Sequence, residues 1–231
     1  MKKSISIYLL IIISLFIFTC INTDPDSIQS ENYVGGDTNV EWGQVGKEFS
    51  VDPKLSGNYY NLNESIEVVN NMDGIVRIMV QLEKLNTPDI QKLLNTLELQ
   101  ELIYMIPPEY FDVYGGMSGD FDLNITSEGI QTYSNIDHVA HTLVKYDCNV
   151  GDTYRLSKPD GTTITRTVIA KSDEEDFPYG SENIKTITIE QDSRIPKIKK
   201  FIIKANQKYG IVYGEAIMEN GLIIGSYINK K

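Results

Sequence analysis

Cysteine, histidine, tryptophan and basic residues are all scarce in this sequence. Its 231 residues include two Cys, two His and one Trp. Two cysteines exclude a disulfide scaffold and a four-cysteine zinc site. Lysine and arginine number 21 against 32 aspartate and glutamate residues, which gives a formal net charge of −11. This charge excludes nucleic-acid binding that depends on neutralising phosphates.

The short motifs of common enzyme classes are also missing. The sequence has no Gly-x-Ser-x-Gly, Walker loop, Gly-x-Gly-x-x-Gly or His-Glu-x-x-His pattern. Cys148 lies between Asp147 and Asn149, and an acidic neighbour raises the pKa of a thiol and disfavours the nucleophilic thiolate. We therefore assign no catalytic residue and no cofactor.

The two histidines, His138 and His141, are the first candidates for a metal site. On a helix this spacing puts both imidazoles on one face, as a zinc pair requires, whereas on a strand they point to opposite faces. The alternation over residues 140–146 favours a strand, although a helical pattern over residues 136–143 stays open. We predict no metal site here.

Asp120, Asp122 and Asn124 resemble the start of an EF-hand loop. Position six of that loop is Ile125 where glycine is required, and position twelve is Gln131 instead of glutamate. The EF-hand interpretation therefore fails. On a strand these three side chains line one face, either as a polar outer surface or as part of a surface Ca²⁺ site completed by another loop.

The strongest signal lies at the N-terminus. A basic start precedes an apolar run over residues 8–18, and Cys20 follows after Thr19. This pattern predicts a signal peptide over residues 1–19. Residues 17–20 form a loose lipobox, so we expect Cys20 to carry acyl chains such as palmitate. Each buried CH₂ of such chains adds about 0.8 kcal/mol to membrane binding.

Behind the acylated cysteine, residues 20–54 predict a flexible tether. The segment is rich in Asp, Asn, Ser, Gly and Gln and has few apolar side chains. It therefore buries too little apolar surface to offset the entropy of ordering. Trp42 lies within it. We expect this ring to dock the end of the tether onto the body, with an exposed ligand-stacking ring as the alternative.

Residues 55–116 predict a mixed helical and strand region. Residues 87–89, Thr-Pro-Asp, form a good helix start, and leucine and isoleucine then recur at helical spacing over residues 90–97 and 99–106. The pattern over residues 65–84 fits a strand and a helix equally well, because periodicity does not separate the two there.

An antiparallel β module is predicted over residues 117–231, behind a glycine-rich hinge at residues 115–119. Its expected strands lie at residues 120–126, 129–134, 138–146, 153–157, 162–171, 184–191, 198–205, 209–219 and 222–228. Asp160-Gly161 and Asn220-Gly221 predict hairpin turns. We find no internal repeat. The predicted fold class is α+β, mainly β, with a small mixed helical N-terminal part and a β meander that forms a barrel or a sandwich.

Three features carry a family resemblance: Cys20 followed by acidic residues, the sequence Val-Gly-Asp-Thr-Tyr at residues 150–154, and the segment at residues 206–212. Together they resemble some Bacteroidetes-type surface lipoproteins, in which an acidic stretch behind the lipidated cysteine precedes a β-rich module. The resemblance implies surface display or outer-membrane tethering, and it supplies no catalytic residues.

Tyrosine is the most informative of the abundant residues, with 14 copies. Its flat apolar face and hydroxyl group suit recognition of a glycan or a protein at low entropic cost. The candidate ligand-binding residues are Tyr133, Tyr154, Tyr213, Asp120 and Asp122.

The leading hypothesis is an envelope lipoprotein, anchored to the outer membrane through its N-terminal lipid, that faces the periplasm or the cell surface. It would bind a glycan, a peptide or a protein partner without catalysis. The first alternative is a secreted hydrolase that cleaves envelope or dietary polymers with paired carboxylates such as Asp120 or Asp122. The second is a structural subunit of an envelope complex.

Overall fold

The computed structural model describes residues 32–55, 58–59, 64–82, 117–133, 139–157, 161–193 and 195–231. Its elements in chain order are η2 (Glu41–Gly43), β1 (Glu48–Leu55), β2 (Asn58–Tyr59), β3 (Glu64–Met72), β4 (Ile75–Leu82), β5 (Met117–Ile125), β6 (Gly129–Thr132), β7 (His141–Lys145), β8 (Thr153–Ser157), β9 (Thr163–Lys171), β10 (Phe177–Tyr179), β11 (Glu182–Ile184), β12 (Ile187–Asp192), β13 (Ile198–Asn206), β14 (Gly210–Met218) and β15 (Ile223–Lys230). Within these ranges, no helix has the length and apolarity needed to cross a bilayer.

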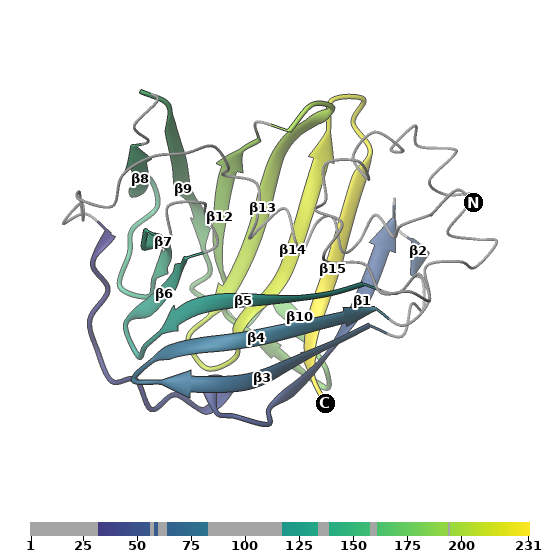
Figure 1. Ribbon diagram of the computed structural model, residues 1–231. Helices are drawn as coiled ribbons and strands as arrows, with labels where there is room; N and C mark the ends of the chain where they lie inside the picture. Colours follow the sequence, from purple (N-terminus) through teal and green to yellow (C-terminus); the bar gives the residue numbers. More distant parts are fainter. Residues whose placement is uncertain are drawn as a thin grey trace.

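The strands form one large antiparallel sheet that curls into a nearly closed barrel. Its order is β7-β6-β5-β4-β3-β1-β15-β14-β13-β12-β9-β8, with β2 added beside β1. Strands β9 and β12 to β15 run upright in Figure 1, and β3 to β5 cross below and in front of them. The two end strands, β7 and β8, lie side by side. The β-rich prediction is therefore confirmed.

Alternating side chains of these strands fill the interior. On β4 the buried positions include Val76, Ile78 and Val80. On the neighbouring β5 they include Phe121, Leu123 and Ile125. This alternation is what a strand needs when one face of its sheet is covered. Trp42 joins the same core at 8% exposure, so its expected docking onto the body is confirmed.

The barrel contains an internal repeat that the sequence pattern did not reveal. Strands β1, β3, β4, β5, β6 and β7 follow one another across the sheet, and β8, β9, β12, β13, β14 and β15 do the same in the second half of the chain. Each half is thus a meander of neighbouring strands. The first strand of each half meets the last strand of the other, at β1 with β15 and at β8 with β7.

Hydrogen bonds around two glycine turns carry this repeat at the level of single atoms. The amide of Gly46 donates to the carbonyl of Val68 at 2.8 Å, and the amide of Gly151 donates to the carbonyl of Val168 at 2.8 Å. Both glycines have positive φ, at 83° and 98°, a region that glycine enters without steric cost.

A β-bulge recurs at the same place in each half. The register of β3 against β4 shifts between Val68 and Asn70, and that of β9 against β12 skips Ile169 next to Val168. A bulge bends and twists its strand. Bulges at the same position in β3 and β9 therefore give the two halves the same local shape. The absence of an internal repeat, inferred from sequence, was therefore wrong.

The two seams of the barrel are joined by different chemistry. At the first seam, β1 and β15 pair residue for residue from Phe49 with Lys230 to Leu55 with Ile224. At the second seam, side chains take over. The amide of Asn32 donates to the carbonyl of Arg155 on β8 at 2.7 Å, and its oxygen accepts the backbone amide of Thr142 on β7 at 3.1 Å. One side chain thus links both end strands.

Arg166 is the second device at this seam. It is 2% exposed and donates to the backbone carbonyls of His141 and Thr142, both at 3.1 Å, and to the amide oxygen of Gln191 at 2.8 Å. Burial lowers the pKa of Arg166 to about 9, so its charge is retained at neutral pH. In the first half, the matching position holds the buried Ile66.

Several sequence predictions need correction. Of residues 65–84, where the sequence pattern fits both a strand and a helix, the described part forms the hairpin of β3 and β4. Residues 48–54 belong to strand β1 and not to a flexible tether. The expected boundary at residue 116 divides no domains, since strands from both sides share one sheet. The helices expected at 90–97 and 99–106, and Cys20 itself, lie outside the described residues.

Candidate functional site

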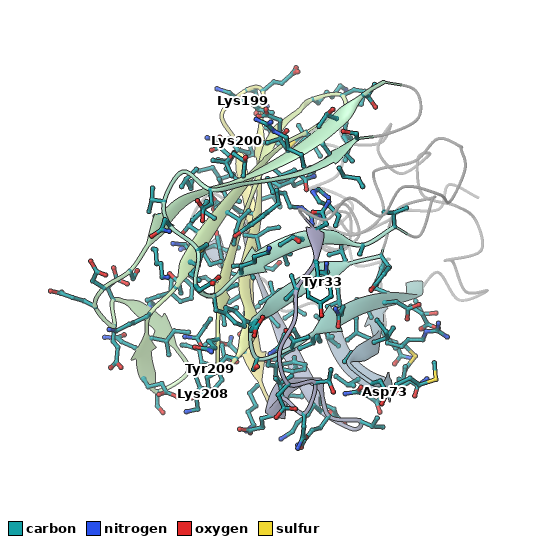
Figure 2. All side chains as sticks on the ribbon, turned by 90° about the vertical axis from the view of Figure 1, so that its left-hand side faces the viewer. Tyr33, Asp73, Lys199, Lys200, Lys208 and Tyr209 are labelled. Carbon is teal, nitrogen blue, oxygen red and sulfur yellow. The ribbon has the colours of Figure 1, made fainter. Side chains whose placement is uncertain are left out.

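One segment breaks the symmetry of the two halves, and it builds the candidate site. In the first half, β3 turns into β4 through Asp73 and Gly74, whose φ values are 52° and 89°, as in a two-residue type I′ hairpin. In the second half, residues 172–186 stand at the same place and carry the β10–β11 hairpin. We call this insertion the arm. Figure 2 puts Asp73 at the lower right, opposite the arm at the lower left.

Aromatic rings hold the arm against the outer face of the barrel. Phe177 of β10 stacks on Tyr227 with ring centroids 5.7 Å apart and packs against Tyr213 at 6.2 Å. The Tyr213 ring lies across Gly225 of the next strand, where a Cβ atom would come within 2.3 Å of the Tyr213 hydroxyl. Glycine at 225 therefore makes room for the ring that receives the arm.

A second set of contacts fixes the tip of the arm. The Tyr179 hydroxyl accepts the backbone amide of Lys230 at 3.1 Å, and its ring lies 4.6 Å from that of Tyr209. The Tyr209 hydroxyl donates to the carboxylate of Glu182 in a very short hydrogen bond. Tyr209 belongs to the turn between β13 and β14, so the arm is tied to a turn at the end of the barrel.

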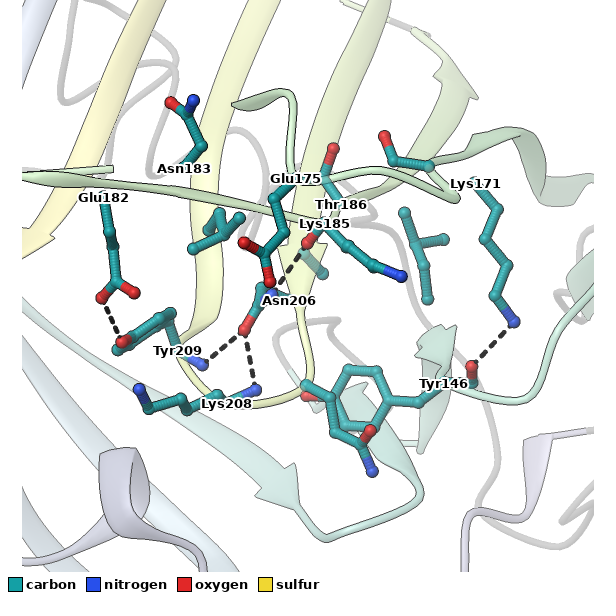
Figure 3. Close-up of a pocket in the computed structure, with 15 residues that line it drawn as sticks. Tyr146, Lys171, Glu175, Glu182, Asn183, Lys185, Thr186, Asn206, Lys208 and Tyr209 are labelled. Atoms are coloured by element: carbon teal, nitrogen blue, oxygen red, sulfur yellow. Dashed lines mark hydrogen bonds between the residues drawn. The ribbon is translucent and has the colours of Figure 1, made fainter. Parts of the chain in front are cut away.

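A cavity of about 420 Å³ lies beside the arm, between it, the end of β9 and the β13–β14 turn. Its size falls in the range of small-ligand sites, about 300–1,000 Å³. Figure 3 shows polar side chains at its rim, and buried Ile187 and Ala205 are among its lining residues. The ring of Tyr146 adds an apolar surface that is 9% exposed.

Some of the polar groups around this cavity are committed to holding its shape. The Asn206 side-chain oxygen accepts the amides of Lys208 and Tyr209 at 2.8 and 3.0 Å, and its nitrogen donates to the carbonyl of Lys185 at 2.8 Å. The Lys171 ammonium donates to the carbonyl of Tyr146 at 3.0 Å. These bonds fix the walls before any ligand arrives.

Other polar groups remain available for a ligand. The side chains of Glu175, Asn183 and Lys185 are exposed and line the cavity. They offer an acceptor, an amide that donates and accepts, and a cationic donor. The charges are close to balance, which suits a neutral polar molecule better than a strongly charged one.

A second cavity of about 370 Å³ lies on the other side of the arm. Its lining includes Glu41, Ser181 and Asn229, which do not line the first cavity. The two cavities share three lining residues: Glu182, Lys208 and Tyr209. We call the two cavities together the arm groove.

The residues singled out from sequence do not converge on this groove. Asp122 forms a bidentate ion pair with Arg77 across β4 and β5, at 2.8 and 3.0 Å, so both of its oxygens are engaged. Asp120 is exposed on the same strand. Tyr133 is half-buried, and burial raises the pKa of its hydroxyl.

The other two tyrosines have structural contacts. Tyr154 is 5% exposed, and its hydroxyl accepts the backbone amide of Lys145 at 3.2 Å. Tyr213 donates to Glu215 at 2.7 Å and lies under the arm. Of the five candidates, Tyr213 alone contacts the segment that builds the groove.

The metal and thiol candidates also have definite places. His141 is buried on β7, and one ring nitrogen lies 3.3 Å from the carbonyl of Tyr154. His138 lies outside the described residues. In the described ranges, no three His, Cys, Asp or Glu side chains converge as a metal site. Cys148 is buried, and burial raises the pKa of its thiol.

Sequence reasoning missed the arm because its strands are only three residues long. Strands this short give no readable alternation. The Gly180-Ser181 turn is the one local signal that it contained.

Comparison with known proteins gives distant likenesses alone. No family model matches the chain, and no curated protein matches it. A "putative exported protein with YmcC-like fold" from Bacteroides fragilis has 12% identity, covers 81% of this chain and 96% of its own, and has a TM-score of 0.46. A "putative lipoprotein" from Parabacteroides distasonis has 10% identity, 82% and 96% coverage, and a TM-score of 0.43. Similarity at this level says nothing about what the chain binds.

Proposed function

We propose that this protein is an envelope lipoprotein, anchored through acyl chains on Cys20, whose barrel binds a glycan in the arm groove without catalysis. The anchor rests on the basic start, the apolar run and the position of Cys20 in the sequence. The binding role rests on the groove, and one observation carries it: an insertion in one half of a repeated barrel borders two open cavities.

The chemistry of the groove favours a glycan over an ionic ligand. Asn183, Lys185 and Glu175 present hydrogen-bonding groups of both kinds. Tyr209 and Tyr146 add apolar ring surface, and tyrosine rings suit a partner with both apolar and polar faces. A sugar offers hydroxyl groups at its edge and C–H groups on its face.

No observation favours the hydrolase alternative. The carboxylates proposed for it from sequence lie on β5, and Asp122 uses both oxygens in its pair with Arg77. A general acid or a nucleophile needs a carboxyl group that can reach its substrate.

The binding proposal is tested with a glycan array. The full chain carrying Cys20→Ser is compared with a variant in which residues 173–185 are replaced by Asp-Gly, the turn that joins β3 to β4. Ser172 already donates to the carbonyl of Thr186 at 2.8 Å, so the short turn closes an existing pair. We expect the variant with the short turn to lose glycan binding, while Asp120→Ala, at a residue that lines neither cavity, keeps it.

Two further variants guard this test against simple unfolding. Asn183→Ala and Lys185→Ala alter exposed side chains, so both are expected to fold and to weaken binding at least fivefold. An array without any glycan signal for the wild-type chain rejects the proposal. Release of reducing sugar from a bound polysaccharide would reverse the non-catalytic assignment.

The anchor is tested separately. Mass spectrometry of the protein from a bacterial membrane fraction should find Cys20 as an acylated N-terminal residue. Cys20→Ala should move the protein out of the membrane fraction. Equal membrane binding of the two proteins would contradict the anchor.

A further inference from the structure

The partition between the two cavities carries an inference about ligand length. It consists of Glu182, Lys208 and Tyr209, the residues that line both cavities. Glu182 begins β11 of the arm, and Lys208 and Tyr209 belong to the β13–β14 turn, so the partition is the place where the arm meets that turn. The two cavities are therefore neighbours that meet at the exposed side chains of Glu182 and Lys208 and at the half-buried ring of Tyr209.

The side chain that covers Tyr209 can move aside at little cost. The Lys208 ammonium lies 4.6 Å from the centroid of the Tyr209 ring, and Lys208 is exposed. An exposed lysine of this kind is held weakly by the ring, because water solvates its ammonium well when the contact is broken. Tyr179 packs against the same ring at 4.6 Å, so the ring keeps its position when Lys208 leaves.

The walls on both sides are set in advance. Asn206 holds the β13–β14 turn through three hydrogen bonds, and Tyr179 is held by the backbone of Lys230. A groove fixed in this way binds a chain-like ligand without a large ordering cost.

We propose that the arm groove binds a linear, neutral oligosaccharide that occupies both cavities at once and crosses the partition at Tyr209. This inference rests on the proposed function and adds the class of glycan to it. One sugar stacks on the Tyr209 ring in the place of the Lys208 ammonium, and sugars on each side fill the two cavities. Because linked units bind with a high effective concentration, affinity rises with chain length until both cavities are filled.

Calorimetric titration of the full chain carrying Cys20→Ser tests this proposal. The probes are fragments of one to six sugars from the polysaccharide with the strongest array signal, together with the cello- and malto-oligosaccharide series. The affinity should rise at least tenfold from the monosaccharide to the longest fragment and then level off.

Two variants each block one cavity. Asn183→Trp fills the first cavity. Ser181→Trp fills the second cavity, because Ser181 lines that cavity and not the first. Each should keep the affinity for the shortest fragment that binds and remove the gain from longer ones. A general structural defect would instead weaken every length by the same factor.

Tyr209→Ala should remove the gain from length in the same way, whereas Lys208→Ala should leave it intact or increase it. Equal affinity for the monosaccharide and the hexasaccharide would overturn the proposal and leave the binding function standing. The absence of binding to every saccharide would overturn both. A loss of affinity in Lys208→Ala that is equal to that in Tyr209→Ala would place Lys208 among the recognition groups and reject its displacement.

Discussion

The Arg166 guanidinium donates to the backbone carbonyl of Thr142 at 3.1 Å, across the one seam of the barrel that has no β ladder. A carbonyl at the edge of a sheet lacks the partner that the next strand would provide, and a buried one must find another. Arg166 gives this partner to β7 from inside the barrel, so a charge in the core completes the backbone hydrogen bonding.

Arg166→Met is therefore expected to destabilise the fold strongly. It leaves the carbonyls of His141 and Thr142 without their donor, and each unsatisfied buried group costs about 1–3 kcal/mol, for a total of about 3 kcal/mol. Urea unfolding followed by circular dichroism measures the loss. The matched control is Arg155→Met on β8, whose side chain is exposed. A loss below about 1 kcal/mol in Arg166→Met would contradict the role of Arg166.

His141 predicts a dependence of stability on pH. Burial, and then the charge of Arg166, hold the pKa of His141 well below its ordinary value of 6.5. Near pH 6.5, His141 therefore binds a proton in the unfolded chain but stays neutral in the folded chain. Stability is full above pH 6.5 and falls below it, by up to about 1.4 kcal/mol per pH unit.

The comparison of wild type with His141→Gln isolates this effect. Glutamine keeps a nitrogen that can donate to the carbonyl of Tyr154 and does not titrate. Unfolding free energies between pH 5 and 7 should decline more steeply in the wild type. Parallel curves would show that His141 accepts its proton in the folded barrel.

Asn32 is expected to hold the second seam closed. Its substitution by alanine leaves the Thr142 amide and the Arg155 carbonyl without partners, at about 2 kcal/mol. Hydrogen exchange should accelerate at β7 and β8 and stay unchanged at β1 and β15, where a full ladder remains. The control is Asn39→Ala, an exposed residue on the same segment. Uniform acceleration over all strands would argue against a local role.

Strands with a single covered face were predicted correctly, and their chemistry explains why. Phe121, Leu123 and Ile125 are buried on β5, and alternation is readable wherever one face is dry and the other wet. The region of β3 and β4 was ambiguous because the bulge next to Val68 breaks the alternation. After a bulge, apolar residues fall at spacings that also suit a helix.

The candidate site was not readable for a different reason. Its groove combines the arm, the end of β9 and the turn at Tyr209, and no local pattern joins segments so far apart. Arg166 shows the same limit: it occupies an inward position between Ile164 and Val168. From sequence alone, an arginine in a strand is expected on the solvent-exposed face. The pattern gives no sign of the backbone carbonyls at the seam that need a donor.

The contact between Tyr213 and Gly225 allows a test of how the arm is seated. A Cβ atom at 225 would lie 2.3 Å from the Tyr213 hydroxyl and 2.9 Å from the ring carbon that bears it. Gly225→Ala should therefore push the ring outward, with an overpacking cost of about 1–3 kcal/mol. The displaced ring should also lose its contact with Phe177 and loosen the arm.

A double-mutant cycle separates this clash from the ordinary preference of a strand for alanine over glycine. In a Tyr213→Ala background the clash is gone, so Gly225→Ala should be neutral or mildly stabilising. Urea unfolding of the four proteins gives the coupling energy, and proteolysis at the arm reports its seating. If Gly225→Ala costs the same in both backgrounds, the position of the Tyr213 ring does not depend on the space that glycine leaves.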